Sequence, residues 1–176
     1  MKLLIVFETV EGQTRKVAHF VEKQIRSAGH DVRVFDTADR LGSLSFDGID
    51  RVVLAAPVHE RRHPKGFEVF VSASHSELKA RPTLLISVSL KAAFPEGLEE
   101  AQDYLIEMEM RTRFKPNMEI LVAGAVRTSS YGYYESQIVQ NVALAGHKVE
   151  LTDGEQEFTD WDALGVKIAA FLQSGA

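Results

Sequence analysis

The chain has 176 residues, of which 45% are hydrophobic and 26% charged, a balance typical of one folded globular domain with a sizeable core. The formal net charge is −5, which excludes the broad basic surface of a nucleic-acid-binding protein. Cysteine is absent, and this excludes disulfides, thiolate metal sites and cysteine nucleophiles. No apolar stretch approaches about eighteen residues, so we expect no transmembrane segment. We predict a cytoplasmic protein and leave open a peripheral contact with the inner membrane.

The first half of the chain alternates strand and helix patterns. Residues 3–7 form an uninterrupted apolar block, the pattern of a strand buried on both faces of a parallel sheet. Apolar residues at helical spacing follow over 14–28, and Gly29 stands where a helix C-terminal glycine belongs. The same reasoning predicts strands over 31–36 and 51–56, the second closed by Pro57, and a short helix over 65–74 with Phe67, Phe70 and Val71 inward.

The second half continues this alternation. We predict a strand over 82–90, a helix over 95–113 with Leu98, Ala101, Leu105 and Met108 on its inner side, a strand over 118–126, helices over 133–145 and 161–172, and an extended piece over 149–152. Asp160 is expected to cap the last helix and Trp161 to pack it onto the sheet. Strands alternating with helices indicate βαβ units, hence one α/β domain over 1–176 with a five-stranded parallel sheet between two helical layers.

The loop after the first strand has the groups that bind a phosphate. In an open parallel sheet, ligands lie beyond the carboxyl ends of the strands. Here the loop Thr9-Val10-Glu11-Gly12-Gln13-Thr14 offers backbone N–H groups, hydroxyls and a helix N-terminus. It is neither a Walker loop nor a GxGxxG loop. A plain strand-to-helix turn is an equal alternative for this pattern, and Glu8 and Glu11 would place two carboxylates beside the phosphate.

Longer stretches of the chain resemble a known family. FETVEGQTRKVAHFV looks like the phosphate loop of flavodoxin-domain proteins, and four further stretches are similar to the flavodoxin-type, quinone-linked protoporphyrinogen dehydrogenases: DRVVLAAPVH, FVSASHSELKARPTLLISVSL, AGAVRTSSYGYYES and FTDWDAL. The resemblance implies a flavodoxin-like three-layer αβα sandwich with strand order 2-1-3-4-5. It also implies non-covalent FMN as cofactor, a tetrapyrrole as small-molecule substrate and a membrane quinone as acceptor.

The resemblance also implies site residues. The phosphate of FMN would lie on Thr9, Val10, Glu11, Gly12, Gln13 and Thr14, and the ring would lie between two loops that contribute Pro57, Val58 and His59, and Ser89, Leu90 and Lys91. The segment from Arg127 to Tyr134 corresponds to a variable segment near the substrate. No residue is assigned as a catalytic acid or base, and His59, His63 and His75 lack the spacing of a metal site.

Candidate substrate contacts lie in two places. Arg61 and Arg62, with Lys65 nearby, could bind propionate groups, or could simply form an exposed charged loop. Arg127 with Tyr131 and Tyr134 could contact a flat ligand, although the tyrosines could equally cap the core at a helix start. The glutamates of the helix over 95–113, Glu100 among them, are interpreted as its solvated side.

Three functional hypotheses follow. The first is an FMN-dependent oxidoreductase of the protoporphyrinogen dehydrogenase type. The second is a binding or regulatory module that has lost FMN, because the loop 57–64 carries Arg61 and Arg62 and lacks the glycine and stacking aromatic usual for the family, so that His59 or His63 would have to substitute. The third is a simple flavodoxin-type electron carrier. The sequence does not indicate the oligomeric state.

Overall fold

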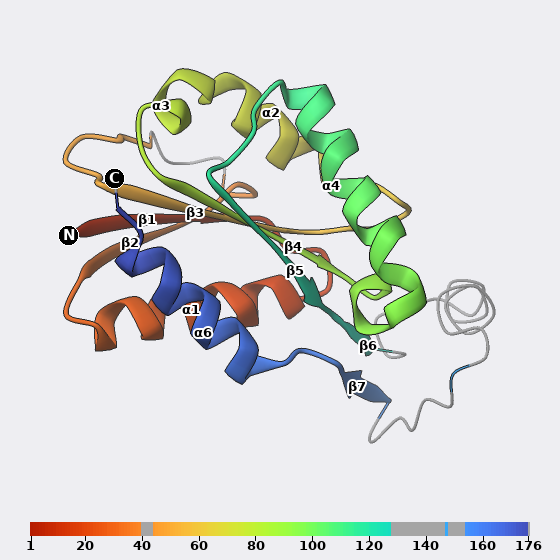
Figure 1. The fold of residues 1–176 in the computed structure, drawn as a ribbon. Coiled ribbons are helices and arrows are strands. Elements are labelled where there is room, and N and C mark those ends of the chain that lie inside the picture. Colours follow the sequence, from red (N-terminus) through yellow and green to blue (C-terminus); the bar gives the residue numbers. More distant parts are fainter. Residues whose placement is uncertain (40–43, 128–146, 148–153, 176) are drawn as a thin grey trace.

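The computed structural model describes residues 1–39, 44–127, 147 and 154–175. Its central sheet is parallel and has the order β2-β1-β3-β4-β5, as predicted (Figure 1). The strands are β1 (Lys2–Phe7), β2 (Asp31–Asp36), β3 (Arg51–Pro57), β4 (Thr83–Ser89) and β5 (Met118–Ala123). Because all five strands run the same way, their carboxyl ends meet at one edge of the molecule.

Helices cover both faces of this sheet. One face carries α1 (Gln13–Ser27) and α6 (Trp161–Gln173), and the other carries α2 (Lys65–Ala73), α3 (His75–Lys79) and α4 (Leu98–Thr112) (Figure 1). Two short 3-10 turns, η1 (Lys91–Ala93) and η2 (Pro95–Gly97), lead into α4. The three-layer αβα sandwich predicted from the alternation of patterns is therefore confirmed.

The apolar block of β1 shows why the sheet is buried on both sides. Leu3, Ile5 and Phe7 belong to the hydrophobic cluster beneath α1 and α6. Leu4 and Val6, on the opposite face, belong to the cluster beneath α2 and α4. Successive side chains of a strand point to opposite faces, so a strand covered on both faces needs apolar residues at every position.

The predicted strand 118–126 is wrong at its end. The chain leaves the sheet at Gly124, whose N–H donates to the carbonyl of Ser89 (3.1 Å) and whose carbonyl accepts from Phe158 (3.0 Å). The next residues form β6 (Ala125–Arg127), which pairs antiparallel with β7 (Glu155–Glu157). This small pair was not predicted, because its two strands lie far apart in the sequence.

The other differences concern helices. Helix α4 begins at Leu98 rather than at residue 95, and Leu98 is 45% exposed rather than inward. Helix α3 was not predicted. Asp160 caps α6 through the N–H of Ala163 (2.9 Å), as expected, and Trp161 packs against the hydrophobic cluster that α1 and α6 form with the sheet, with its ring 5.0 Å from that of Phe20. The predicted helix 133–145 and extended piece 149–152 lie outside the described residues.

Candidate functional site

The loops predicted to hold a ligand meet at the carboxyl edge of the sheet. They follow β1, β3 and β4, and hydrogen bonds join the start of the first two loops to the neighbouring strand. The N–H of Glu8 donates to the carbonyl of Ala55 (3.1 Å), and that of Val58 donates to the carbonyl of Val88 (2.8 Å). Pro57 pairs with Val88 in the register of β3 and β4, so Pro57 and Val58 lie next to the end of β4. No described helix is long and apolar enough to cross a membrane.

The phosphate loop has the backbone geometry of an anion site. Gly12 has φ = 94°, a left-handed conformation that favours glycine, and its N–H donates to the hydroxyl of Thr9 (2.9 Å). Helix α1 begins at the next residue, and its described first turn has no side-chain cap and no acidic residue. The N-terminal turn therefore presents N–H groups and the positive end of the helix dipole.

Thr14 supplies the sharpest test of whether a phosphate fits. The residue is 1% exposed, and its hydroxyl is buried without a hydrogen-bond partner among the described residues. A buried hydroxyl that lacks a partner costs free energy, so such a group binds a water molecule or a ligand. A phosphate oxygen at the start of α1 would satisfy it, and the loop fits the phosphate of a mononucleotide.

Glu8 does not compete with a phosphate in this structure. Its carboxylate accepts a hydrogen bond from the Thr37 hydroxyl (2.5 Å). It also lies against the first turn of α2, since a Cβ added to Gly66 would be 3.0 Å from its Oε2 atom. A carboxylate at a helix N-terminus is favourable. The side chain of Glu8 is therefore directed toward Thr37 and α2.

The loop after β3 is a tight turn built from charged residues. His59 and Arg62 exchange two backbone hydrogen bonds of 2.9 and 3.0 Å. The two residues between them have positive φ, 48° for Glu60 and 64° for Arg61. Glycine and asparagine normally occupy such positions, so this backbone is strained. The loop after β3 thus adopts the backbone conformation of a glycine-containing turn although Glu60 and Arg61 occupy the two positions with positive φ.

His63 does not take the place of a stacking aromatic. The residue is 1% exposed, and its Nε2 atom lies 2.9 Å from the hydroxyl of Ser87 in β4. Burial lowers the pKa of the imidazole to about 4, with the Glu68 carboxylate opposing and Arg111 adding to the shift. His63 is therefore a neutral group that supports the β3 loop from beneath.

The arginines of this loop are held in ion pairs. Arg62 contacts the Glu68 carboxylate at 2.6 Å, and Arg111 contacts its other oxygen at 2.9 Å. Arg61 contacts Glu100 at 2.8 Å and keeps 71% of its side chain exposed. Of the two predicted substrate contacts in this loop, Arg61 is the more exposed, at 71% against 51% for the side chain of Arg62.

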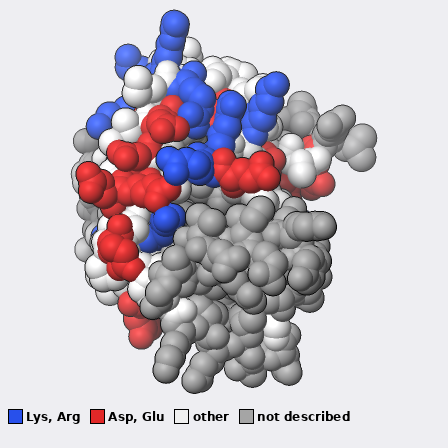
Figure 2. Space-filling model, turned by 90° about the vertical axis from the view of Figure 1, so that its right-hand side faces the viewer, with Lys and Arg blue, Asp and Glu red and all other residues white. Residues whose placement is uncertain are grey.

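Glu100 connects two of the predicted loops. Its carboxylate accepts from Arg61 after β3, and its other oxygen contacts Lys91 after β4 at 2.8 Å. It also accepts from the Tyr104 hydroxyl. The interpretation of Glu100 as a solvated helix residue is therefore wrong, because the fold brings two cations to it. Positive and negative side chains are interspersed on the described part of this side of the molecule (Figure 2).

Phe94 is a residue that the sequence reasoning missed. It follows η1, shortly after the residues predicted to flank the ring, and its ring stacks on His147 with centroids 3.9 Å apart. Its edge contact with Phe158, at 5.5 Å, ties this loop to the chain after β7. The signal was the single aromatic residue in the stretch Ser89–Pro95. Tyr131 and Tyr134 lie outside the described residues.

Arg127 lies on the phosphate loop. Its guanidinium donates to the backbone carbonyl of Glu11 and to the side-chain oxygen of Gln13 (3.0 Å). It also forms an ion pair with Glu155 (3.1 Å). The residue predicted to contact substrate from beyond β5 is thus directed to the loop after β1.

Comparison with known proteins agrees with this architecture. The flavodoxin domain family matches residues 4–152, and the chain belongs to that family. Relatives from bacteria and from Leishmania major are named protoporphyrinogen IX dehydrogenase [quinone]. The one from Escherichia coli K12 is 27% identical over 92% of this chain and 90% of its own length. The one from Leishmania major is 25% identical over 93% of this chain and 71% of its own length.

Solved structures show the same fold. Oxidised flavodoxin 1 from Bacillus cereus covers 100% of both chains with a TM-score of 0.60 and 18% identity. A flavodoxin from the domain Archaea covers 99% of this chain and all of its own, with a TM-score of 0.53 and 14% identity. A Fusobacterium nucleatum flavodoxin bound to flavin mononucleotide has a TM-score of 0.50 and 13% identity, covering 97% of this chain and 94% of its own.

Proposed function

We propose that this chain is an FMN-dependent oxidoreductase that dehydrogenates a protoporphyrinogen-type tetrapyrrole and passes the electrons to a quinone. The observation that carries the proposal is the loop 9–14. Helix α1 begins there without a side-chain cap, and the buried hydroxyl of Thr14 has no partner among the described residues, so both can bind an anion. The two relatives named protoporphyrinogen IX dehydrogenase [quinone] support the substrate and the acceptor.

The residues of the chain would divide the work as follows. Backbone N–H groups of the loop 9–14, with the hydroxyl of Thr14, bind the phosphate. Pro57, Val58 and His59 lie on one side of the ring, and Ser89, Leu90 and Lys91 on the other. When bound, FMN supplies reversible redox chemistry, and no side chain of this chain is required as an acid or base.

The substrate contact that we propose is Arg61. Both arginines pair with a carboxylate, but Arg61 is the more exposed and its partner Glu100 is 28% exposed, whereas the partner of Arg62, Glu68, is buried, so a carboxylate of the substrate reaches Arg61 more readily. Arg62 therefore belongs to the support of the loop. Tyr131 and Tyr134 stay predictions from the sequence.

Two observations favour this function over a module that has lost FMN. That alternative rested on the carboxylate of Glu8, on the two arginines of the β3 loop and on the absence of a glycine and a stacking aromatic there, and the two observations concern the first two grounds. Glu8 is directed to Thr37, and both arginines are paired with carboxylates. The electron-carrier alternative shares the FMN site and differs only in lacking a substrate of its own.

The test begins with the visible spectrum of the purified protein and a titration with FMN. Flavin absorbance bands, or tight quenching of FMN fluorescence, are expected. A protein that stays colourless and leaves FMN fluorescence unchanged contradicts the proposal. The second step measures oxidation of a porphyrinogen with a quinone acceptor, and Arg61→Ala is expected to raise KM while leaving FMN affinity unchanged. FMN binding without porphyrinogen turnover would favour the electron carrier.

A further inference from the structure

Arg127 holds the phosphate loop from a distant part of the chain. It is the last residue of β6, and 14% of its side chain is exposed. Its two terminal nitrogens donate to the carbonyl of Glu11 and to the side-chain oxygen of Gln13. A Cβ added to Gly12 would lie 2.8 Å from Nη1 of Arg127, so the guanidinium covers the turn directly before α1.

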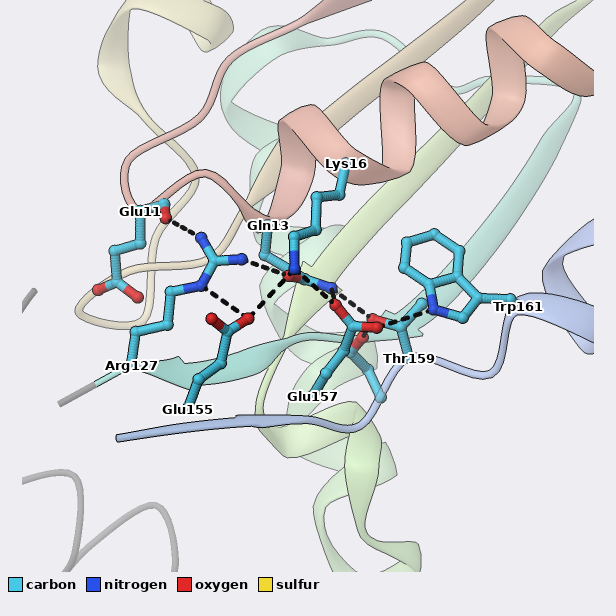
Figure 3. Close-up of polar contacts among 9 residues, drawn as sticks. Glu11, Gln13, Lys16, Arg127, Glu155, Glu157, Thr159 and Trp161 are labelled. Atoms are coloured by element: carbon cyan, nitrogen blue, oxygen red, sulfur yellow. Dashed lines mark hydrogen bonds and ion pairs between the residues drawn. The ribbon is translucent and has the colours of Figure 1, made fainter. Parts of the chain in front are cut away.

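The β6–β7 pair contributes carboxylates to the same contact (Figure 3). Glu155 contacts both Arg127 (3.1 Å) and Lys16 of α1 (3.2 Å). Glu157 contacts Lys16 at 3.2 Å and accepts from the amide of Gln13 at 2.9 Å. We call Gln13, Lys16, Arg127, Glu155 and Glu157 the loop clasp.

The charges of the loop clasp are balanced. Lys16 and Arg127 supply two cations, and Glu155 and Glu157 supply two carboxylates. Arg127 consequently brings little net charge to a phosphate. What distinguishes it is geometry, since a guanidinium can bind two acceptors at once through its planar fork.

The direction of the Glu11 carbonyl decides whether the loop can bind an anion. Backbone N–H groups converge on a phosphate only where the carbonyls of the same peptides point away from it. The peptide joining Glu11 and Gly12 is held at both of its polar groups, because its carbonyl accepts from Arg127 and its N–H donates to the Thr9 hydroxyl, so Arg127 fixes the orientation of the peptide directly before α1. The second bond places the side chain of Gln13, which is 7% exposed, at the first position of α1.

We propose that Arg127 is a positioning residue that sets the phosphate loop in its anion-binding shape before ligand arrives, with Glu155 as its counterion. The inference rests on the proposed binding of FMN. It assigns Arg127 to the cofactor loop rather than to the substrate. Because the contact is made by β6, the pairing of β6 with β7 and the order of the loop are linked.

The first test needs no ligand. Amide hydrogen exchange of residues 9–14 is compared among the wild type, Arg127→Met, Arg127→Lys and Arg15→Met. Arg15 is the matched control, because its cation lies near the same loop but pairs with Asp36 at 3.1 Å. Both Arg127 variants are expected to speed exchange in 9–14 by about tenfold, and Arg15→Met by less than about threefold. Equal exchange in Arg127→Met and the wild type would overturn the inference.

The second test compares ligands with and without phosphate. Arg127→Met and Arg127→Lys are both expected to weaken FMN binding at least about tenfold, while riboflavin affinity changes less than about threefold. Full FMN affinity in Arg127→Lys would show that a positive charge at position 127 suffices, and would overturn the inference. Equal losses of FMN affinity in Arg127→Met and Arg15→Met would also show an effect of charge alone and would overturn it. Equal losses for FMN and riboflavin, with a lower Tm, would indicate a general structural role and also overturn it.

Different results would contradict the proposed function and the proposed role of Arg127. Wild-type protein that binds no FMN contradicts the proposed function. The exchange comparison in the ligand-free protein still decides whether Arg127 orders the loop.

Discussion

At the scale of single residues, the β3 loop is supported most clearly by the neutral imidazole of His63. The side chain lies beneath the β3 loop against Ser87, and it approaches the Glu68 carboxylate that Arg62 and Arg111 share. Arg62 and Arg111 also lower the pKa of Glu68, against the opposing effect of burial. The loop predicted to flank the ring is therefore supported by one neutral and one ionised buried group.

His63 predicts a pH dependence of stability. Burial lowers its pKa from 6.5 to about 4, so between these values the unfolded chain binds the additional proton. The free energy of unfolding is expected to decrease as pH falls from 6.5 to about 4, by about 3 kcal/mol in total from this group. Urea unfolding at pH 7 and pH 4.5 should show a smaller decrease in His63→Gln than in the wild type. His19→Gln, where 60% of the side chain is exposed, should keep the wild-type decrease. The same decrease in His63→Gln and the wild type would contradict the assignment.

At the scale of elements, the connection from β4 to α4 is set by close backbone approach. A Cβ added to Gly97 would lie 2.3 Å from the carbonyl oxygen of Lys91, so η1 and η2 are in contact at this point. The same segment carries Lys91, which contacts Glu100, and Phe94, which packs on Phe158. The apolar spacing predicted a helix beginning at Pro95, but the sequence contained no sign of this backbone contact.

Gly97→Ala is expected to lower the free energy of unfolding by about 1 to 3 kcal/mol, because the methyl group meets backbone rather than a flexible side chain. Gly165→Ala is the control. A Cβ there would lie 3.7 Å from the Phe20 ring, an ordinary contact, within helix α6, and should stabilise the protein by about 0.5 to 1 kcal/mol. Denaturant unfolding measures both variants. Similar stabilities for the two would show that η1 and η2 move apart readily.

At the scale of the whole molecule, Arg51 connects the start of β3 to the end of the chain. The residue is 7% exposed, and it donates to the carbonyl of Phe171 (2.7 Å) and the hydroxyl of Ser174 (2.9 Å). Its guanidinium also lies 5.4 Å from the centroid of the Phe171 ring. Helix α6 is thus held on the sheet by a buried cation as well as by its apolar side.

Arg51→Met is expected to lower the free energy of unfolding by about 2 to 4 kcal/mol, because it removes the charged donor from the buried Phe171 carbonyl and from the partly buried acceptors of Ser174. Arg33→Met serves as the comparison, since Arg33 makes one exposed contact with the Ser45 carbonyl. That variant should change stability by less than about 0.5 kcal/mol. Thermal unfolding followed by far-UV circular dichroism measures both. A loss below about 1 kcal/mol in Arg51→Met would mean that apolar packing alone holds α6.

The sequence by itself determined the five strands of the central sheet, apart from the end of β5, their order through the family resemblance, and the loop that we predict to bind a phosphate. These features depend on residues that are close in the chain: apolar blocks such as Leu3–Phe7, the helical spacing of α1, and the threonines and glycine of 9–14. Short-range patterns reflect burial and backbone preference, so they can be recognised without knowledge of the fold.

Only the tertiary structure decided the partners of the charged residues. Arg127 donates a hydrogen bond to the carbonyl of Glu11, 116 positions earlier in the chain. Glu100 forms ion pairs with Arg61 and Lys91, which lie in two different loops. Likewise, the end of β5 at Gly124 depends on Ser89 and Phe158. An exposed charge and a paired one look alike in a sequence, because the partner is selected by the topology that brings distant loops to one edge of the sheet.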